Sequence, residues 1–284
     1  MSITIESLVA ANLLDGLFKI AVKAENVEIV TLLLKDGRVD PSANNNRAIQ
    51  LASENGHDGV VALLLKDDRV DPSANNNRAI QLASENGHDG VVQLLLKDDR
   101  VDPSSDNNYA VQSAIRNGHD GVVELLLQDD RVDPSANDNY SIRLASNNGH
   151  DGVVALLLKD DRVDPSVNNN YAIQWASEDG HDGIVALLLK DERVDPSVNN
   201  NHAIQLASEN GHYGIVELLN NYTKSKESDN SIINITRKAM EQDKIKVVMY
   251  MIREKRSELK SIETEIIDWA IEKELDDVVE SLCN

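Results

Sequence analysis

The pentapeptide Arg-Val-Asp-Pro-Ser occurs six times in this chain, and successive copies begin 31 residues apart. All six prolines lie in these copies, and the pair Gly-His recurs in the same register from Gly56-His57 to Gly211-His212. A fixed period of this length is the sequence signature of a repeat architecture. We therefore expect stacked units of one kind, with the pentapeptides starting at Arg38, Arg69, Arg100, Arg131, Arg162 and Arg193.

A weaker form of the period extends into both flanks. In a clear unit a small alanine, such as Ala52, precedes a pair of β-branched residues by eight positions, and Ala21, Ala239 and Ala270 keep this spacing. We therefore predict about nine units. The predicted division is an N-terminal capping helix (1–16), a degenerate first repeat (17–38), six regular repeats (39–221) and two degenerate repeats that form a C-terminal cap (222–284). A separate helical module from Ser231 onward is the alternative.

Each unit contains signals for two helices. Asp40-Pro41-Ser42 and the run 44–46, which is all Asn, are typical of turns, and Asn45 or Asn46 could cap a first helix. Gly56 is the residue expected at the left-handed end of that helix. A second, apolar helix should begin near Asp58, whose carboxylate suits the positive end of a helix.

A two-helix unit of about thirty residues is too small to bury its own apolar face, so neighbouring units must cover one another. The fold class that we predict is all-α, a solenoid of stacked helix-turn-helix repeats.

The Asn-Gly-His turn and the Val-Val-x-Leu-Leu-Leu second helix resemble the ankyrin-repeat family. The family pattern Thr-Pro-Leu-His-x-Ala is replaced here by Arg-Ala-Ile-Gln-Leu-Ala at 47–52, and each unit is two residues shorter. The resemblance therefore implies that the family's β-hairpin finger is reduced to a tight Asp-Pro turn. This short-loop variant is similar to ankyrin proteins of large DNA viruses of amoebae and of slime moulds. The resemblance implies protein recognition without catalysis, on a concave face that would include Asn46, Glu54, Asn55 and Asp67 with their counterparts.

Charge and composition exclude several other functions. The chain has 49 Asp and Glu against 28 Lys and Arg, a formal net charge of −21, which disfavours nucleic acid and anionic membrane surfaces as partners. It favours a basic protein partner and a monomeric state. The single cysteine, Cys283, cannot form an internal disulfide, so we expect a cytoplasmic location, in the host cytoplasm if the protein is viral.

We expect no catalytic residue, no metal site and no cofactor. The six Gly-His histidines recur once per unit, and packed helices lie about 8–10 Å apart, so adjacent units cannot share one ion. We predict instead that each histidine orders the turn between its two helices. Acid pairs such as Asp67-Asp68 lack the glycine-spaced calcium pattern and are interpreted as solvated surface. Phosphate-binding glycine loops and glycine-flanked nucleophilic serines are missing from the sequence.

Recognition should lie where the repeats differ. The first position of the first helix changes from Arg47 and Arg78 to tyrosine in the next three units, and positions on the same helices change to arginine or asparagine. Tyrosine and arginine are common in protein interfaces. Trp175 replaces a repeated leucine, and we interpret it as an enlarged core residue. The predicted partner-binding residues are Tyr109, Arg116, Tyr140, Arg143, Asn147 and Tyr171, although sequence drift is an equally simple reason for the changes.

The sequence thus predicts a non-catalytic protein-interaction scaffold. Two alternatives stay open. One is a structural component that associates with its own copies, and the other is an adaptor whose C-terminal segment recruits host machinery.

Overall fold

A computed structural model describes residues 5–229 and 232–283 of the chain. The described residues form helices, turns and bends without a β-strand, and neighbouring helices pack in chain order, which confirms the predicted all-α solenoid. The chain divides into two compact units, Met1–Ile215 and Val216–Asn284, which we describe separately. Residues 1–4, 230–231 and 284 of the predicted caps lie outside the described residues.

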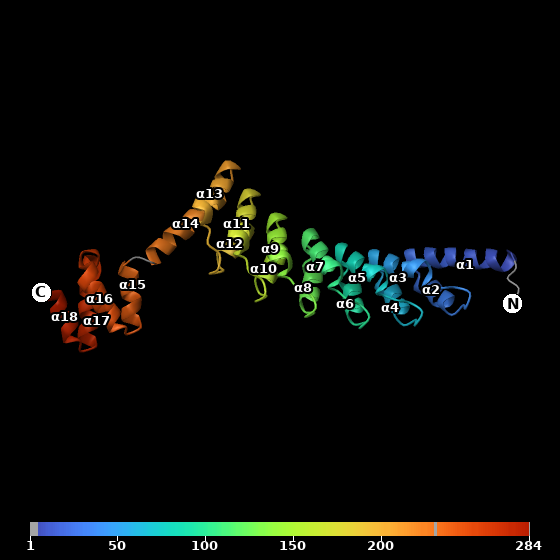
Figure 1. Ribbon diagram of the computed structural model, residues 1–284, viewed down its shortest axis with the longest axis horizontal. Helices are drawn as coiled ribbons and strands as arrows, with labels where there is room; N and C mark the ends of the chain where they lie inside the picture. The colour runs from blue at the N-terminus through green and yellow to red at the C-terminus, as the bar shows by residue number, and fades with distance from the viewer. Residues whose placement is uncertain (1–4, 230–231, 284) are drawn as a thin grey trace. The chain divides into compact units, whose positions relative to one another are not determined.

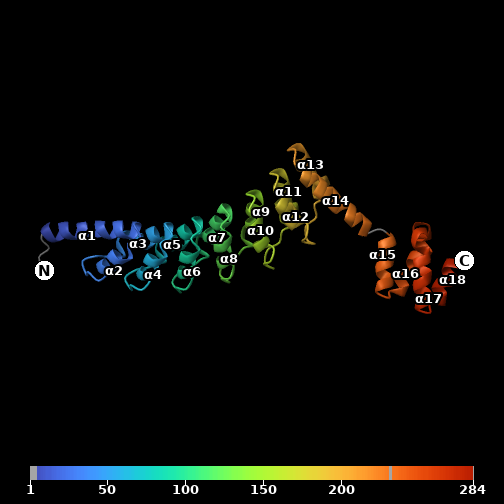
Figure 2. The same cartoon turned by 180° about the vertical axis from the view of Figure 1, so that it is seen from behind.

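The first unit is a file of helical hairpins (Figures 1 and 2). The first helix of each hairpin packs on the first helix of the next, and most second helices pack on their neighbours in the same way, so the hairpins form two layers. α1 continues without a break across residue 16, where we predict that the capping helix ends. The hairpins are α1 (Ile5–Lys23) with α2 (Val27–Leu34), α3 (Ala43–Glu54) with α4 (Asp58–Leu64), α5 (Ala74–Glu85) with α6 (Asp89–Leu96), α7 (Ser105–Asn117) with α8 (Asp120–Leu127), α9 (Ala136–Asn147) with α10 (Asp151–Leu157), α11 (Val167–Glu178) with α12 (Asp182–Leu188), and α13 (Val198–Glu209), which is followed by α14 (Tyr213–Asp229).

The core is aliphatic and repeats with the period. In the α3–α4 hairpin, Ile49, Ala52, Val60 and Leu64 are at most 1% exposed, and their counterparts in the next hairpins are buried in the same way. Residues 65–73, which join this hairpin to the next, contain turns and no strand. As predicted from a unit two residues shorter than the family pattern, this loop is a tight turn and has no β-hairpin.

A left-handed turn opens each regular first helix. Asn44, Asn45 and Asn46 all have φ between 56° and 60°, and the corresponding three residues of the next five units are also left-handed. Every one of these positions is Asn or Asp, the non-glycine residues that tolerate this conformation best.

The predicted helix cap at Asn45 or Asn46 is wrong. Asn46 is 8% exposed, and its Oδ1 accepts the backbone N–H of Asp71, in the next repeat, at 2.7 Å. Its amide therefore joins two repeats instead of ending a helix. The same bond recurs in four further pairs: Asn77–Asp102, Asn108–Asp133, Asn139–Asp164 and Asn170–Asp195.

The turn inside each hairpin is left-handed as expected, with Gly56 at φ 72° and the N–H of His57 donating to the carbonyl of Ala52 at 3.0 Å. The hairpins of the degenerate repeats at both ends have the same left-handed turn, although no glycine is present in it. Glu25, Asp243 and Glu274 take the positive φ. The corresponding bonds join Asn26 to Ala21, Lys244 to Ala239 and Leu275 to Ala270.

The second unit contains two further hairpins around a separate apolar core. Its helices are the part of α14 from Val216 onward, α15 (Ile232–Glu241), α16 (Ile245–Lys255), the short 3₁₀ helices η1 (Arg256–Glu258) and η2 (Lys260–Ile262), α17 (Glu263–Glu272) and α18 (Asp276–Cys283). Val248, Ile252, Ile266, Ala270 and Val278 lie at the centre of this core, each at most 2% exposed.

Candidate functional site

The repeated histidines connect neighbouring repeats. The Nε2 of His88 lies 3.1 Å from the carbonyl oxygen of Glu54, at the end of the first helix one repeat earlier. A carbonyl only accepts, so the Nε2–H donates. The ring also packs over the preceding turn, because a Cβ added to Gly56 would lie 2.6 Å from its Nδ1. We expected the histidine to order its own turn, and its side chain instead bonds the repeat before it. The other contacts are His57–Lys23, His119–Glu85, His150–Arg116, His181–Asn147 and His212–Glu178.

The repeated arginines have the same bridging role. Arg100 binds both carboxylate oxygens of Asp98 in its own loop, and its Nη1 donates to the carbonyl of Val70, 30 residues earlier, at 2.8 Å. The hydrogen bond from Arg100 lowers the pKa of Asp98, while partial burial opposes the shift. The corresponding bridges run from Arg69 to Val39, Arg131 to Val101, Arg162 to Val132 and Arg193 to Val163.

The repeated histidine, arginine and asparagine side chains therefore bond within the stack. Among the described residues, no group of three or more His, Cys, Asp or Glu side chains could hold a metal ion. The residues that the resemblance placed on a recognition face also bond internally. Asn55 donates to the carbonyl of Leu51, Glu54 pairs with Arg47 at 3.2 Å, and Asp67 pairs with Arg69 at 2.6 Å. Asn46 is buried, so its expected place on that face is wrong.

Four of the side chains at variable positions come together on two neighbouring first helices, α9 and α11. The guanidinium carbon of Arg143 lies 5.5 Å from the ring centre of Tyr140 and 5.8 Å from that of Trp175. Trp175 in turn stacks on Tyr171 with ring centres 5.6 Å apart. We call these four residues the α9–α11 surface, and each ring contact is within the range of a favourable cation–π or stacked pair.

Arg143 is held in this place by its backbone contact. Its Nη2 donates to the carbonyl of Asn137 in the left-handed turn at 3.1 Å. In the other regular repeats glutamine bonds the next carbonyl of this turn, as Gln174 does to Asn169 at 2.5 Å. Arg143 therefore bonds the same left-handed turn one carbonyl earlier than glutamine does, and it adds a cation beside two rings. Its Nε is buried, and no partner for it is found within the described part of the chain.

The other three predicted residues lie outside this surface. Tyr109 is half-buried on α7, and no ring contact among the described residues includes it. Arg116 is exposed at the end of α7, where its carbonyl accepts from His150. Asn147 is exposed and donates to Asp179, one repeat later, at 2.7 Å.

Sequence reasoning missed two members of this region. Trp175, which we interpreted as a core residue, is half-buried and forms part of the surface, so that interpretation is wrong. Its spacing of four from Tyr171 places the two side chains on one helix face, a signal that was present in the sequence. Asp179 stands where five other units have asparagine, and this change accompanies the change to Asn147 in the preceding repeat.

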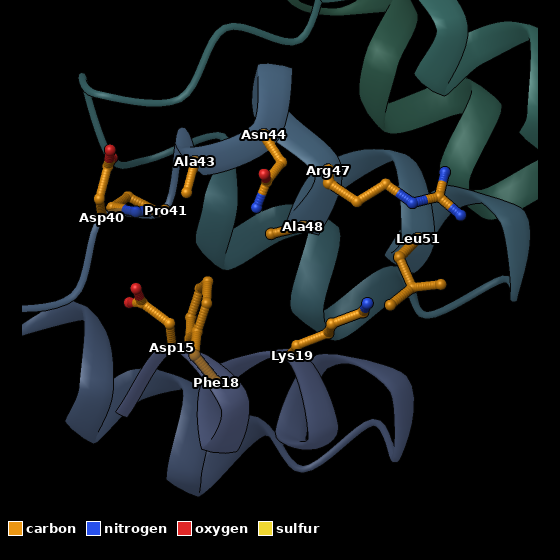
Figure 3. Close-up of a pocket in the computed structure, with 10 residues that line it drawn as sticks. All are labelled: Asp15, Phe18, Lys19, Asp40, Pro41, Ala43, Asn44, Arg47, Ala48 and Leu51. Atoms are coloured by element: carbon orange, nitrogen blue, oxygen red, sulfur yellow. The ribbon is translucent and has the colours of Figure 1, made fainter. Parts of the chain in front are cut away.

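A cavity of about 300 Å³ lies between α1 and α3 (Figure 3). Asp15, Phe18 and Lys19 of α1 face Ala48 and Leu51 of α3 across it. Residue 15 is one period before Asn46, yet α1 is a regular helix there and has no left-handed turn. The cavity thus lies where an internal repeat would have its turn, and its lining mixes two acids (Asp15, Asp40) with two bases (Lys19, Arg47).

No helix in the described ranges combines the length and the hydropathy that crossing a bilayer requires. Residues 68–138 and 142–230, more than half of the chain, match a protein-family model described as ankyrin repeats in three copies. No curated protein matches the chain, so the likeness to ankyrin proteins of amoebal viruses and slime moulds has no support from a homologue.

Proposed function

Because the chain belongs to the ankyrin-repeat family, whose repeats generally mediate protein–protein interaction, we propose that it is a non-catalytic scaffold that binds a partner protein on the α9–α11 surface. The observation that carries this proposal is the contact of Arg143 with Tyr140 and Trp175, which joins two repeats. A regular repeat such as the one that contains α5 lacks this cluster of an arginine and aromatic rings. At the corresponding positions α5 carries Arg78, Gln81 and Leu82.

The chemistry of the surface supports this role. Tyrosine, tryptophan and arginine are the residues most enriched among those that dominate binding energy in interfaces. Tyr171 is 40% exposed, so part of its ring is open to a partner. Because the arginine is already oriented by two rings and one carbonyl, less side-chain entropy is lost on binding.

The net charge of the first unit favours a basic partner. Residues 1–215 carry 34 Asp and Glu against 17 Lys and Arg, a net charge of −17. A field of this sign accelerates encounter with a positively charged protein. We extend the proposal to a cytoplasmic, monomeric protein, in which Tyr109, Arg116 and Asn147 flank the contact region.

The test uses variants that restore the repeated sequence. Tyr140→Arg, Arg143→Gln, Tyr171→Arg and Trp175→Leu together give α9 and α11 the residues that α5 has at these positions. A photo-crosslinking amino acid replaces Tyr171, because this position is exposed, whereas nearby residue 173 is part of the core. The matched control replaces Tyr213, which is 75% exposed, with the same amino acid. Crosslinked proteins are identified by mass spectrometry, and the affinity of each purified protein is measured by calorimetry.

We expect one protein to crosslink from position 171 and not from position 213, and its affinity to fall about tenfold or more in the restored variant. Arg78→Tyr, a change at the matching position of α5, should leave the affinity unchanged. Crosslinks that are equal at both positions, or an affinity that survives the restoration, would contradict the proposed surface.

Self-association is a second candidate because α1 exposes a stripe of apolar residues. Leu13, Leu17 and Ile20 are 74%, 42% and 65% exposed and are spaced as neighbours on one helix face. Light scattering over a range of concentrations distinguishes the two functions. A mass that rises with concentration, and returns to that of one chain in Leu13→Glu/Ile20→Glu, supports self-association.

A further inference from the structure

A groove in the second unit combines apolar and cationic side chains. It has a volume of about 630 Å³ and is lined mainly by α16, with Ser281 of α18 at one side. Ile245 and Tyr250 are 40% and 54% exposed, although both are large apolar or aromatic side chains. The lining residues are Ile245, Lys246, Met249, Tyr250, Ile252, Arg253, Arg256 and Ser281.

The charge of this groove is opposite to that of the chain. Its three charged lining residues, Lys246, Arg253 and Arg256, are all basic, while the chain has a net charge of −21. Arg253 pairs with Glu254 at 2.8 Å and Arg256 with Glu263 at 3.5 Å, and the two arginine side chains stay 78% and 43% exposed. The second unit as a whole has 15 Asp and Glu against 11 Lys and Arg, a net charge of −4. Basic side chains are thus concentrated in the lining of this groove.

The groove differs from the regular repeats at matching positions. Lys244 donates its N–H to Ala239 as His57 does to Ala52, which places α16 in register with α4. In this register Ile245 replaces Asp58, Lys246 replaces Gly59, and Tyr250 replaces the half-buried Leu63. An acid, a glycine and an aliphatic residue have therefore become an apolar residue, a base and an exposed aromatic ring.

The length of the groove indicates the shape of what fits it. The lining runs from Ile245 to Arg256, eleven residues along the chain, which is roughly 16 Å at the helical rise. This length corresponds to three turns of a bound helix, and apolar side chains at helical spacing in such a groove are a common mode of peptide recognition.

The two ends of the groove differ in charge. A second hollow of about 320 Å³ shares Ile245 and Met249 with it and is lined by Glu274, Asp276 and Asp277. A bound helix therefore meets Arg253 and Arg256 at one end of the groove, and Glu274, Asp276 and Asp277 at the other end. This arrangement defines one favourable direction for a helix that is acidic at one end only.

We propose that this groove binds an amphipathic helix of a partner protein, with acidic residues at the end that faces Arg253 and with apolar residues along the side that faces Met249 and Tyr250. This binding site is independent of the α9–α11 surface. It gives the chain a second interaction surface, as an adaptor requires.

The test uses the full chain and a labelled synthetic helical peptide with leucines at helical spacing, glutamates at one end and lysines at the other. Fluorescence anisotropy measures binding to the native chain and to two charge-reversal variants. Arg253→Glu alters the groove, and Lys238→Glu alters an exposed lysine of α15 outside it. Circular dichroism checks that both variants are folded.

We expect saturable binding that weakens about tenfold in Arg253→Glu and is unchanged in Lys238→Glu. Tyr250→Ala should also weaken binding, and a peptide with glutamates replaced by lysines should not bind. Lack of binding by the native chain, or equal affinity of both charge variants, would overturn the proposal. It would also be overturned if the chain sedimented with phosphatidylserine vesicles and did not bind the peptide.

Discussion

The packing of each histidine over the preceding glycine turn can be tested by adding one methyl group. In Gly87→Ala the new Cβ would lie 2.6 Å from Nδ1 and 2.8 Å from Cε1 of His119 in the next repeat. Gly87 also has φ +74°, in the left-handed region that alanine disfavours. The ring of His119 cannot move away freely, because its Nε2 is bonded to the carbonyl of Glu85 at 3.0 Å.

The size of the effect follows from three contributions. The left-handed backbone costs an alanine about 1–2 kcal/mol, and the added volume costs about 1–3 kcal/mol. A displaced ring also loses a hydrogen bond worth about 0.5–1.5 kcal/mol. These contributions overlap, so we expect the free energy of unfolding to fall by about 2–5 kcal/mol.

The chain offers a matched control for the backbone contribution. Gly211 has φ +78°, yet a Cβ added there meets nothing within 4 Å. Gly211→Ala should therefore cost only about 1–2 kcal/mol. Gly37 is not left-handed and has equally open space, so Gly37→Ala should be nearly neutral.

Urea denaturation of the full chain, followed by far-UV circular dichroism, measures all three variants. The packing argument requires Gly87→Ala to be clearly less stable than Gly211→Ala. If the two variants have the same free energy of unfolding, the histidine does not pack on the turn, and the stacking described above is refuted.

Three further predictions concern the bonds between repeats and the arginine of the α9–α11 surface. Asn77→Ala should lower the free energy of unfolding by about 1–3 kcal/mol more than Asn76→Ala, because both residues are left-handed and only Asn77 accepts the N–H of Asp102; equal urea midpoints would contradict this. Arg143→Gln should lower the free energy of unfolding by no more than about 1 kcal/mol, since glutamine bonds a neighbouring carbonyl of the same turn in α11 and only the ring contacts are lost without replacement. A larger loss in thermal denaturation would show that Arg143 supports the fold. The bond from Arg100 lowers the pKa of Asp98 below 3.8 in the folded chain. This pair therefore stabilises the fold above pH 3.8, and the stabilisation is lost as the pH falls from 3.8 towards the pKa of the folded chain. Asp98→Asn should therefore reduce stability near neutral pH and have little effect at strongly acid pH, and a loss that is independent of pH in urea titrations would contradict the assignment.

The fold was predictable because the backbone preferences and the apolar spacing that determine it act over a few residues. The turn at Gly56 was predicted because glycine tolerates positive φ, whereas 44–46 was predicted as a turn with a helix cap and not as three left-handed residues. The apolar spacing within a unit indicates which helix faces are buried. The proposed functional surface was predictable only in part. Tyr140, Arg143 and Tyr171 were identified from their variation between repeats, while Trp175 was assigned to the core although its spacing from Tyr171 already placed both rings on one face.

The sequence by itself determined the period, the two helices of each unit and the residues at each turn, since these depend on backbone conformation near each residue. Only the tertiary structure decided what the repeated polar side chains bind. Asn77, Arg100 and His119 all bond groups in a neighbouring repeat, between 25 and 34 residues away. Residues so far apart in the sequence come into contact only when one hairpin is stacked on the next. A local sequence pattern therefore does not distinguish a residue that orders its own turn from one that joins two repeats.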